Sequence, residues 1–422
     1  MNERTIAPRG GHWVLALLLV AYIFNFLDRQ ILGILAQPIK ADLNLSDTQF
    51  GAIGGLAFAL LYSLLGIPLA YLADKTSRSG VIAASLAVWS AFTALCGTAH
   101  GYWQLFLYRL GVGIGEAGGV APSYALIADY YPPERRARAL AIFSLGIPIG
   151  LAAGTMIGAY IAKAVNWRAA FIAMGVVGVI LAPILRYFVR DLPRDRSPKP
   201  DAPLSSVFPM LARKPAFWLL AFASSASSLC GYGLALWTPS VLIRSFGLDL
   251  LSTANFLASL LLLGGCAGVF AGGWLADRLG RMDRGWYAKL PGIAWLITAP
   301  TFAAGLLAPN LWLAWPLLLI PNALNILWLG PVTTAVQHLV PRPMRATASA
   351  SFLLINNLVG LGVGPLLIGG LSDALKSTYG VDALRNAAVA CCGFYLVATL
   401  LMLLCIKPLR AGWVDDNPQP TI

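Results

Sequence analysis

The chain contains few charged residues. Of its 422 residues only 11% are Asp, Glu, Lys or Arg, whereas 58% are hydrophobic. A soluble domain typically carries about 25% charged residues, because its surface must be solvated. This scarcity of charge excludes an ordinary soluble globular protein and indicates a chain that folds in lipid.

Residues with the chemistry of enzymes and metal sites are also scarce. The chain has three histidines and six cysteines, and the cysteines all fall in or beside apolar segments, as small apolar fillers would. The segment Gly113–Gly118 spells a dinucleotide fingerprint but lacks the strand that such a site requires. Glycines at 111 and 115 more simply allow close helix packing. We expect no enzyme activity, no metal and no cofactor.

Long apolar runs fill most of the chain. A run of about 20 residues is long enough to cross a bilayer as a helix. The sequence predicts twelve such spans, at 13–38, 48–73, 80–99, 102–129, 139–163, 168–189, 215–244, 251–275, 286–308, 311–340, 346–373 and 385–407. The first is not a cleaved signal peptide, because it lacks a small-residue cleavage site and leads into eleven further spans. We therefore predict an all-α membrane protein with twelve transmembrane helices.

The basic residues indicate a topology. The net charge is +12, and most of the 30 Lys and Arg residues fall in segments on the same side as the N-terminus. Cytoplasmic loops of membrane proteins are enriched in Lys and Arg in this way. The asymmetry predicts that both termini are cytoplasmic and, for a bacterial chain, that the protein lies in the inner (plasma) membrane. It also removes the need for a nucleic-acid partner.

The chain divides into two similar halves. A proline-rich polar stretch separates them, which predicts an N-terminal six-helix bundle at 1–190, a cytoplasmic linker at 191–214 and a C-terminal six-helix bundle at 215–422. Leu72–Lys75 follows the second span as Leu275–Arg278 follows the eighth, and similar proline-arginine segments follow the fourth and tenth spans. Two signatures that recur in the same order indicate duplication of a six-helix unit. Many secondary transporters are built from such repeats and bind substrate between them.

The segment Gly273–Arg281 resembles the loop signature of the major facilitator superfamily, and a degraded copy with Ala70 and Ser77 in place of glycines follows the second span. The resemblance implies a twelve-helix fold that works by alternating access. It also implies that the loop residues latch the cytoplasmic side, although they also fit simple topology charges. These predicted gate residues are Asp74, Asp277, Arg278 and Arg281.

Two further segments are similar to the spinster-like transporters of that superfamily. They are Phe26–Gln30 and the glycine-rich block Tyr108–Ser123, which runs on to Asp129. The resemblance implies proton-linked movement of lysolipids, sphingosine-1-phosphate or related amphiphiles. Gly118–Gly119 departs from the serine–tyrosine pair that often follows Gly–Glu–Ala in that family. An anion symporter for small organic acids carries a similar Asp–Arg pair, and the fifth span partly resembles that of multidrug exporters, so both remain alternatives.

Four charged residues lie deep inside the predicted spans, away from the span ends. Asp28 and Arg29 are in the first span, and Arg109 and Glu116 are in the fourth, seven residues apart and thus on one face of a helix. A charge at bilayer depth costs roughly 3 kcal/mol, so it usually serves a function. We predict that Glu116 and Asp28 carry protons and that Arg29 and Arg109 are counter-charges. Static salt bridges, or a non-transporting receptor on the same fold, are the simpler alternatives.

The C-terminal half offers neutral polar and aromatic side chains in its spans instead of charges. A cavity with charge on one wall and an apolar, weakly polar surface on the other suits an amphiphile with one ionic end. We therefore expect the partners to be a small amphiphilic substrate, protons and membrane lipid, and the protein to be a monomer. The predicted substrate-binding residues are Arg29, Glu116, Tyr232, Trp237 and Asn356.

Overall fold

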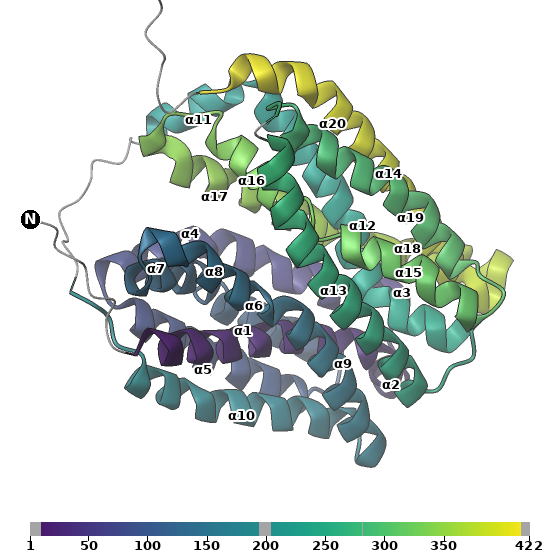
Figure 1. Cartoon of the computed structure of the whole chain (residues 1–422). Helices are drawn as coiled ribbons and strands as arrows, with labels where there is room; N and C mark the ends of the chain where they lie inside the picture. Colours follow the sequence, from purple (N-terminus) through teal and green to yellow (C-terminus); the bar gives the residue numbers. More distant parts are fainter. Residues whose placement is uncertain (1–9, 194–203, 281, 415–422) are drawn as a thin grey trace, which may run out of the picture.

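The computed structural model describes residues 10–193, 204–280 and 282–414, and all regular secondary structure in these residues is helical (Figure 1). The first half consists of α1 (Gly11–Ile34), α2 (Ala36–Leu43), α3 (Asp47–Ala52), the π-helix η1 (Ile53–Ala57), α4 (Phe58–Lys75), α5 (Arg78–Cys96), α6 (Tyr102–Glu116), α7 (Val120–Tyr130), α8 (Pro133–Ser144), α9 (Gly146–Ala164) and α10 (Trp167–Phe188).

A short helix, α11 (Leu204–Ala212), lies within the predicted linker, whose residues 194–203 are outside the described part of the chain. The second half consists of α12 (Pro215–Ser245), α13 (Leu250–Gly280), α14 (Trp286–Leu306), α15 (Leu311–Leu324), α16 (Leu329–Gln337), the 3-10 helix η2 (Arg342–Met344), α17 (Arg345–Asn356), the π-helix η3 (Asn357–Leu361), α18 (Gly362–Tyr379), the 3-10 helix η4 (Gly380–Asp382), α19 (Ala383–Cys391) and α20 (Gly393–Gly412).

The twelve predicted spans coincide with these helices, so the predicted fold class is confirmed. Within the described residues, nine helical stretches are long and apolar enough to cross a membrane, and the last of them, Arg345–Gly412, covers two predicted spans. The fourth and ninth predicted spans do not meet that criterion. The Gly-rich segment after Glu116 divides the fourth span into α6 and α7. Several other spans are divided in the same way, which the apolar pattern alone does not predict.

Polar side chains fix where several helices begin. Ser77 accepts a hydrogen bond from the backbone N–H of Gly80 (2.9 Å) at the start of α5. Asn166 accepts one from the N–H of Ala169 (2.8 Å) at the start of α10, and Asn310 does the same for Leu313 (3.0 Å) at the start of α15. The first N–H groups of a helix have no intrahelical partner, so these caps stabilise each start.

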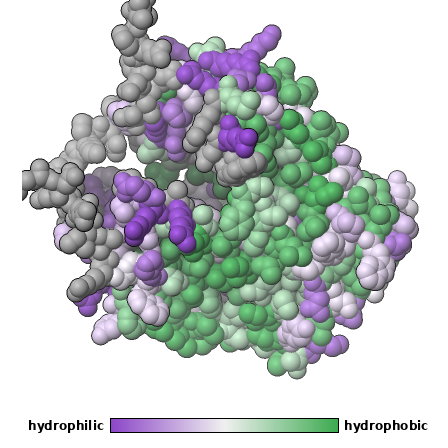
Figure 2. All heavy atoms as spheres, viewed as in Figure 1, coloured by the Kyte–Doolittle hydropathy of each residue, from purple (hydrophilic) through white to green (hydrophobic). Residues whose placement is uncertain are grey.

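The two halves form two groups of helices that meet at one end and diverge at the other (Figure 1). Figure 2 shows a broad hydrophobic surface across the middle of the molecule, with hydrophilic residues gathered towards its ends and a hollow between the two groups. Large apolar side chains such as Trp312 (92% exposed) lie on this surface, as expected of a face that contacts lipid. We call the end where the halves meet the closed end and the other the open end.

Backbone packs directly against backbone at the closed end. A Cβ atom on Gly51 would lie 2.4 Å from the carbonyl oxygen of Pro365, and one on Gly369 would lie 2.3 Å from that of Asp47. A Cβ on Gly55 would lie 2.7 Å from the carbonyl oxygen of Gly362. Only glycine allows α3 and η1 of the first half to approach α18 of the second half this closely.

Helix α6 is also held in place by glycines. A Cβ on Gly115 would lie 2.3 Å from the backbone nitrogen of Trp89 on α5, and one on Gly111 would lie 2.3 Å from the Phe92 ring. On the opposite side, a Cβ on Gly113 would lie 2.4 Å from the carbonyl oxygen of Phe58 on α4. The predicted role of Gly111 and Gly115 in close packing is confirmed.

Substitution of Gly115 tests this packing. Gly115→Ala is expected to lower the free energy of unfolding by about 1–3 kcal/mol, because the new methyl group overlaps the α5 backbone, which cannot rotate away. Gly66→Ala on α4 is the matched control, since a Cβ there meets nothing within 4 Å. Thermal unfolding in detergent should separate the two variants. Equal melting temperatures would contradict the close contact between α5 and α6.

Candidate functional site

Two helices of the first half carry the predicted charged residues. Asp28 and Arg29 lie on α1, and Arg109 and Glu116 lie on α6. Asp28, Arg109 and Glu116 are each 2% exposed or less. Glu116 is the last residue of α6, because the chain leaves the helix over Ala117–Gly119 before α7 begins. The structure therefore brings all four residues into the interior of the first half.

Arg29 and Glu116 form a buried ion pair. The Nε atom of Arg29 donates to Oε2 of Glu116 at 2.7 Å. The Glu116 side chain is fully buried, whereas the Arg29 side chain remains 15% exposed. A charge-assisted hydrogen bond of this length is strong and directional. The pair joins α1 to α6 and leaves one of its two members within reach of solvent.

Asp28 points to a different helix, as expected for side chains about 100° apart around α1. Its Oδ2 accepts a hydrogen bond from the Thr93 hydroxyl on α5 at 3.1 Å. Arg109 interacts electrostatically with both Asp28 and Glu116. The Nε atom of Arg109 has no hydrogen-bond partner among the described residues. Both acids therefore lie within the electrostatic reach of Arg109.

Aromatic rings surround the guanidinium of Arg29. Its central carbon lies 5.2 Å from the centroid of the Phe26 ring, 4.8 Å from that of Phe58 and 4.8 Å from that of Tyr62. The Arg109 guanidinium also lies over Phe58, at 5.2 Å. These cation–π contacts were not predicted from the sequence, because an aromatic residue in an apolar span is usually packing. The contacts of Phe58 and Tyr62 with the arginines become evident only from the structure, in which α4 lies close to Arg29 and Arg109.

The three predicted substrate-binding residues of the second half lie in three different environments. Tyr232 is partly exposed and lies in the neighbourhood of Arg29 from the other half. Trp237 is fully buried at the closed end, where its indole N–H donates to the Pro365 carbonyl at 2.8 Å. The Oδ1 atom of buried Asn356 accepts a hydrogen bond from the Ser228 hydroxyl at 2.9 Å. Of the three, Tyr232 is the one that faces the charged residues.

Of the predicted gate residues, Asp74 and Arg278 lie at the open end of the molecule. Arg78, at the start of α5, donates to Asp74 at 2.6 Å and to Asp129 at 2.6 Å, which ties the ends of α4, α5 and α7 together. Asp129 is a member of this cluster that sequence reasoning did not assign. Arg278 is exposed at the end of α13. The side chain of Asp277 and the whole of Arg281 lie outside the described residues.

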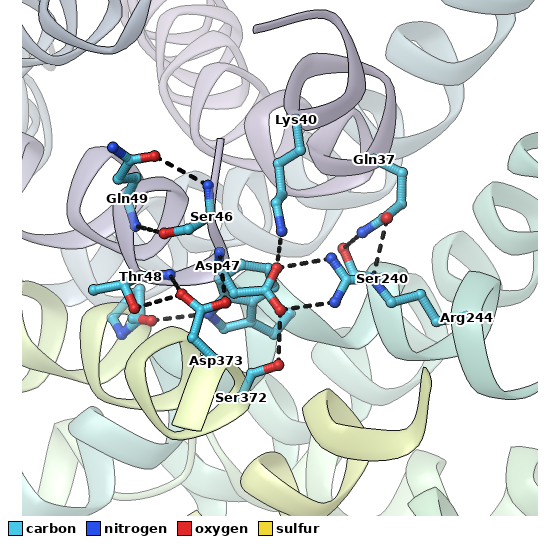
Figure 3. A network of polar contacts seen from close by, with 12 residues as sticks. Gln37, Lys40, Ser46, Asp47, Thr48, Gln49, Ser240, Arg244, Ser372 and Asp373 are labelled. Carbon is cyan, nitrogen blue, oxygen red and sulfur yellow. Dashed lines mark hydrogen bonds and ion pairs between the residues drawn. The ribbon is translucent and has the colours of Figure 1, made fainter. Parts of the chain in front are cut away.

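A second polar cluster, which we call the closed-end network, joins the two halves at the closed end (Figure 3). Its centre is the Asp47 carboxylate, which accepts hydrogen bonds from both terminal nitrogens of Arg244 (2.8 and 2.7 Å) and from the Ser372 hydroxyl (2.7 Å), and which also pairs with Lys40. The members of the network are Gln37, Lys40, Asp47, Thr48, Ser240, Arg244, Ser372 and Asp373.

An acid of the second half caps a helix of the first half in this network. The Asp373 carboxylate accepts hydrogen bonds from the backbone N–H groups of Asp47 (3.2 Å) and Thr48 (2.8 Å) and from the Thr48 hydroxyl (2.6 Å). Helix α3 also has a capping box of its own, formed by Ser46 and Gln49. The start of α3 therefore keeps a cap if Asp373 moves away.

Sequence reasoning missed the closed-end network. Its charged members stand at the ends of the predicted spans, where charges are expected for topology alone. Asp47 and Arg244 are also almost 200 positions apart, so no local spacing connects them. The sequence does show acids and bases at these span ends. It does not show which acid pairs with which base.

Buried charge inside one of two paired helical halves is typical of a class of protein, the polytopic secondary transporters. Residues 18–365 match the Major Facilitator Superfamily, and the chain belongs to that family. Its members are transporters rather than enzymes.

Three relatives refine this assignment. The chain is 34% identical to an MFS-type efflux pump of Mycolicibacterium smegmatis, over 90% of this chain and 89% of that protein. It is 28% identical to protein spinster homolog 1 of Mus musculus, over 89% of this chain and 76% of that protein. A crystal structure of a bacterial homologue of the human lysosomal transporter spinster, in an inward-facing and unoccupied conformation, matches with a TM-score of 0.86 and 28% identity over 98% of this chain and 100% of that one. The predicted resemblance to spinster-like transporters is confirmed.

Removal of one member of the ion pair should cost more than removal of both. Arg29→Met is expected to destabilise the protein by about 3–5 kcal/mol at alkaline pH, because it leaves Glu116 as an uncompensated buried charge. The loss should be smaller at acidic pH, where a proton can neutralise that acid. The double variant Arg29→Met/Glu116→Gln should recover most of the lost melting temperature. Additive losses in the double variant would show that the two side chains do not depend on each other.

Proposed function

We propose that this protein is a proton-coupled secondary transporter that moves an amphiphilic substrate, such as a lysolipid or a sphingosine-1-phosphate-like molecule, by alternating access. The observation that carries the proposal is the Arg29–Glu116 ion pair, in which a fully buried acid is held by a partly exposed arginine. Such a pair can respond both to a proton and to an anionic substrate.

Proton coupling follows from the change of partner that this arrangement permits. A carboxylate beside a guanidinium is favoured in its ionised form, whereas a carboxyl group in an apolar surrounding without that partner is favoured as the neutral acid. A movement that loosens the contact between Arg29 and Glu116 therefore loads a proton, and its return releases one. Asp28 is the second proton-carrying acid, because Arg109 interacts with both acids.

The distribution of polar groups supports an amphiphilic substrate. The first half holds the charges, and Arg29 is the exposed cation that can bind an anionic headgroup. The described spans of the second half contribute Tyr232 and neutral hydrogen-bonded groups such as Asn356, which suit an uncharged tail better than a sugar. The spinster relatives agree with this substrate class, and the efflux pump relative favours export of amphiphilic compounds as the second candidate.

The closed end is proposed to face away from the cytoplasm. The similar crystal structure is inward-facing, and the gate residues predicted to be cytoplasmic lie at the open end here. On this assignment both termini are cytoplasmic, residues 191–214 connect the two bundles on that side, and the protein works as a monomer in a bacterial inner membrane. The closed-end network must then open for the substrate to reach the other side.

Transport into liposomes with an imposed pH gradient tests the function. Wild-type protein is expected to move a labelled lysolipid at a rate that follows the gradient, and Glu116→Gln is expected to remove the gradient-driven part, because Gln carries no titratable proton. Glu134→Gln, at an exposed acid in the first turn of α8, is the matched control and should behave as wild type.

Three other outcomes of that experiment would redirect the proposal. Gradient-driven uptake of a small organic acid without lysolipid movement would identify an anion symporter. Proton-driven expulsion of varied amphiphilic dyes would identify an exporter. Gradient-driven lysolipid transport that persists in Glu116→Gln would show that this acid is a static structural group.

The closed-end network provides a test of alternating access. Asp47→Asn is expected to increase the population opened at this end roughly tenfold, because the amide cannot hold the two cations that the carboxylate pairs. Asp42→Asn is the control: Asp42 pairs with Arg168 within the first half, and that hydrogen-bonded guanidinium lowers the pKa of Asp42. Double electron–electron resonance between spin labels at the exposed positions Ala41 and Ser377 should show a longer distance in the first variant alone. Unchanged distances in both variants would mean that the network does not hold the closed state.

A further inference from the structure

Phe58 occupies an unusual place next to the charged residues. It is the first residue of α4, directly after the π-helix η1, and it is 1% exposed. A π-turn adds a residue to a helical turn, so it rotates the residues that follow relative to an uninterrupted α-helix. The orientation of Phe58 towards α1 and α6 therefore depends on this local irregularity.

The Phe58 ring makes cation–π contacts with two arginines from two other helices. The Arg29 guanidinium on α1 lies 4.8 Å from its centroid, and the Arg109 guanidinium on α6 lies 5.2 Å from it. Tyr62, one turn further along α4, stacks on Phe58 at 5.1 Å with an interplanar angle of 22° and also faces Arg29. The two rings thus form one aromatic surface against the cations of the ion-pair site.

The backbone on both sides keeps this ring in place. Gly113 of α6 approaches the Phe58 carbonyl so closely that a Cβ would lie 2.4 Å from it. Three residues before Phe58, Gly55 is in equally tight contact with Gly362 of the second half. The stretch from Gly55 to Phe58 therefore touches the opposite half on one side and the charged site on the other.

Arg29 consequently has two kinds of partner. Glu116 attracts it only while that acid is ionised, whereas the face of an aromatic ring attracts a cation at any pH, because the ring does not titrate. When Glu116 takes up a proton, the guanidinium would be left as a poorly compensated charge in a low-dielectric site, which is unfavourable. The aromatic surface stabilises the Arg29 guanidinium in this state through its cation–π contacts.

We propose that Phe58 is a positioning residue for proton coupling, which retains Arg29 at the site while Glu116 is neutral. The proposal rests on the proposed proton-coupled transport and deepens it. Phe58 contacts neither proton nor substrate; it acts through Arg29, and it lets Glu116 be protonated without loss of the cation that binds the substrate headgroup.

A titration of Glu116 tests this role without any transport assay. The infrared band of protonated carboxyl groups is followed against pH in purified protein, and the part of the band that disappears in Glu116→Gln is assigned to Glu116. Phe58→Leu is expected to move the pH of half-protonation of Glu116 to lower values, by roughly tenfold in proton affinity, because the neutral-acid state loses the ring that holds Arg29. Phe58→Tyr keeps the ring and should titrate as wild type.

Phe50→Leu is the matched control. Phe50 is also fully buried on the same span, but its ring contacts Trp237 at the closed end, with centroids 5.6 Å apart. It should leave the titration unchanged. If Phe58→Leu fails to fold, a fluorinated phenylalanine at this position keeps the shape and weakens the negative face of the ring, and the same shift is expected.

An unchanged half-protonation pH, or one moved to higher values, would overturn the proposal, since the ring would then not favour the neutral-acid state. The titration does not require a known substrate. A failure of lysolipid transport therefore leaves this test intact, and a failure of this test leaves the transport measurement intact.

Discussion

The ion pair between Arg29 and Glu116 is the interaction on which the arrangement of the first half depends. A fully buried carboxylate in a membrane protein needs a cation at hydrogen-bond distance, and the 2.7 Å contact supplies one from a different helix. That requirement ties α1 to α6, although each helix packs mainly against other helices of the first half. It also explains the glycines of α6, because only a helix without side chains at positions 111, 113 and 115 can come close enough to its neighbours to bury Glu116 beside Arg29.

The two halves share one plan but differ in chemistry. In the first half the described spans hold two buried acids and two arginines, with Glu116 paired to Arg29. In the second half several polar groups of the spans are neutral and hydrogen-bonded, as in the hydrogen bond from Ser228 to Asn356 or from Trp237 to the Pro365 carbonyl. Such bonds do not depend on pH. The acids and arginines that are buried deep in the described spans therefore lie in the first half.

The contacts between the halves are of two kinds. Glycine allows backbone to meet backbone between α3, η1 and α18. These contacts make the closed end compact and involve no charged group. The closed-end network adds directional bonds, with Asp47 bound by Arg244 from the opposite half and α3 capped by Asp373. Because α3 keeps its own capping box, these bonds can separate while the helix stays folded. The seam between the halves is thus built from contacts that can separate with each helix intact.

The sequence by itself determined the membrane location, the twelve spans, the duplicated halves, the family and the identity of the four buried charges, because each follows from local composition or from the order of motifs. It also restricted Arg109 and Glu116 to one helix face. Only the tertiary structure decided that Glu116 pairs with Arg29, that Asp28 meets Thr93, that Phe58 lies against both arginines and that Asp47 is bound across the halves. Helical periodicity sets the face on which a side chain lies, but the neighbour of that face depends on how whole helices rotate and pack. Contacts between residues that are far apart in the chain arise only from that packing.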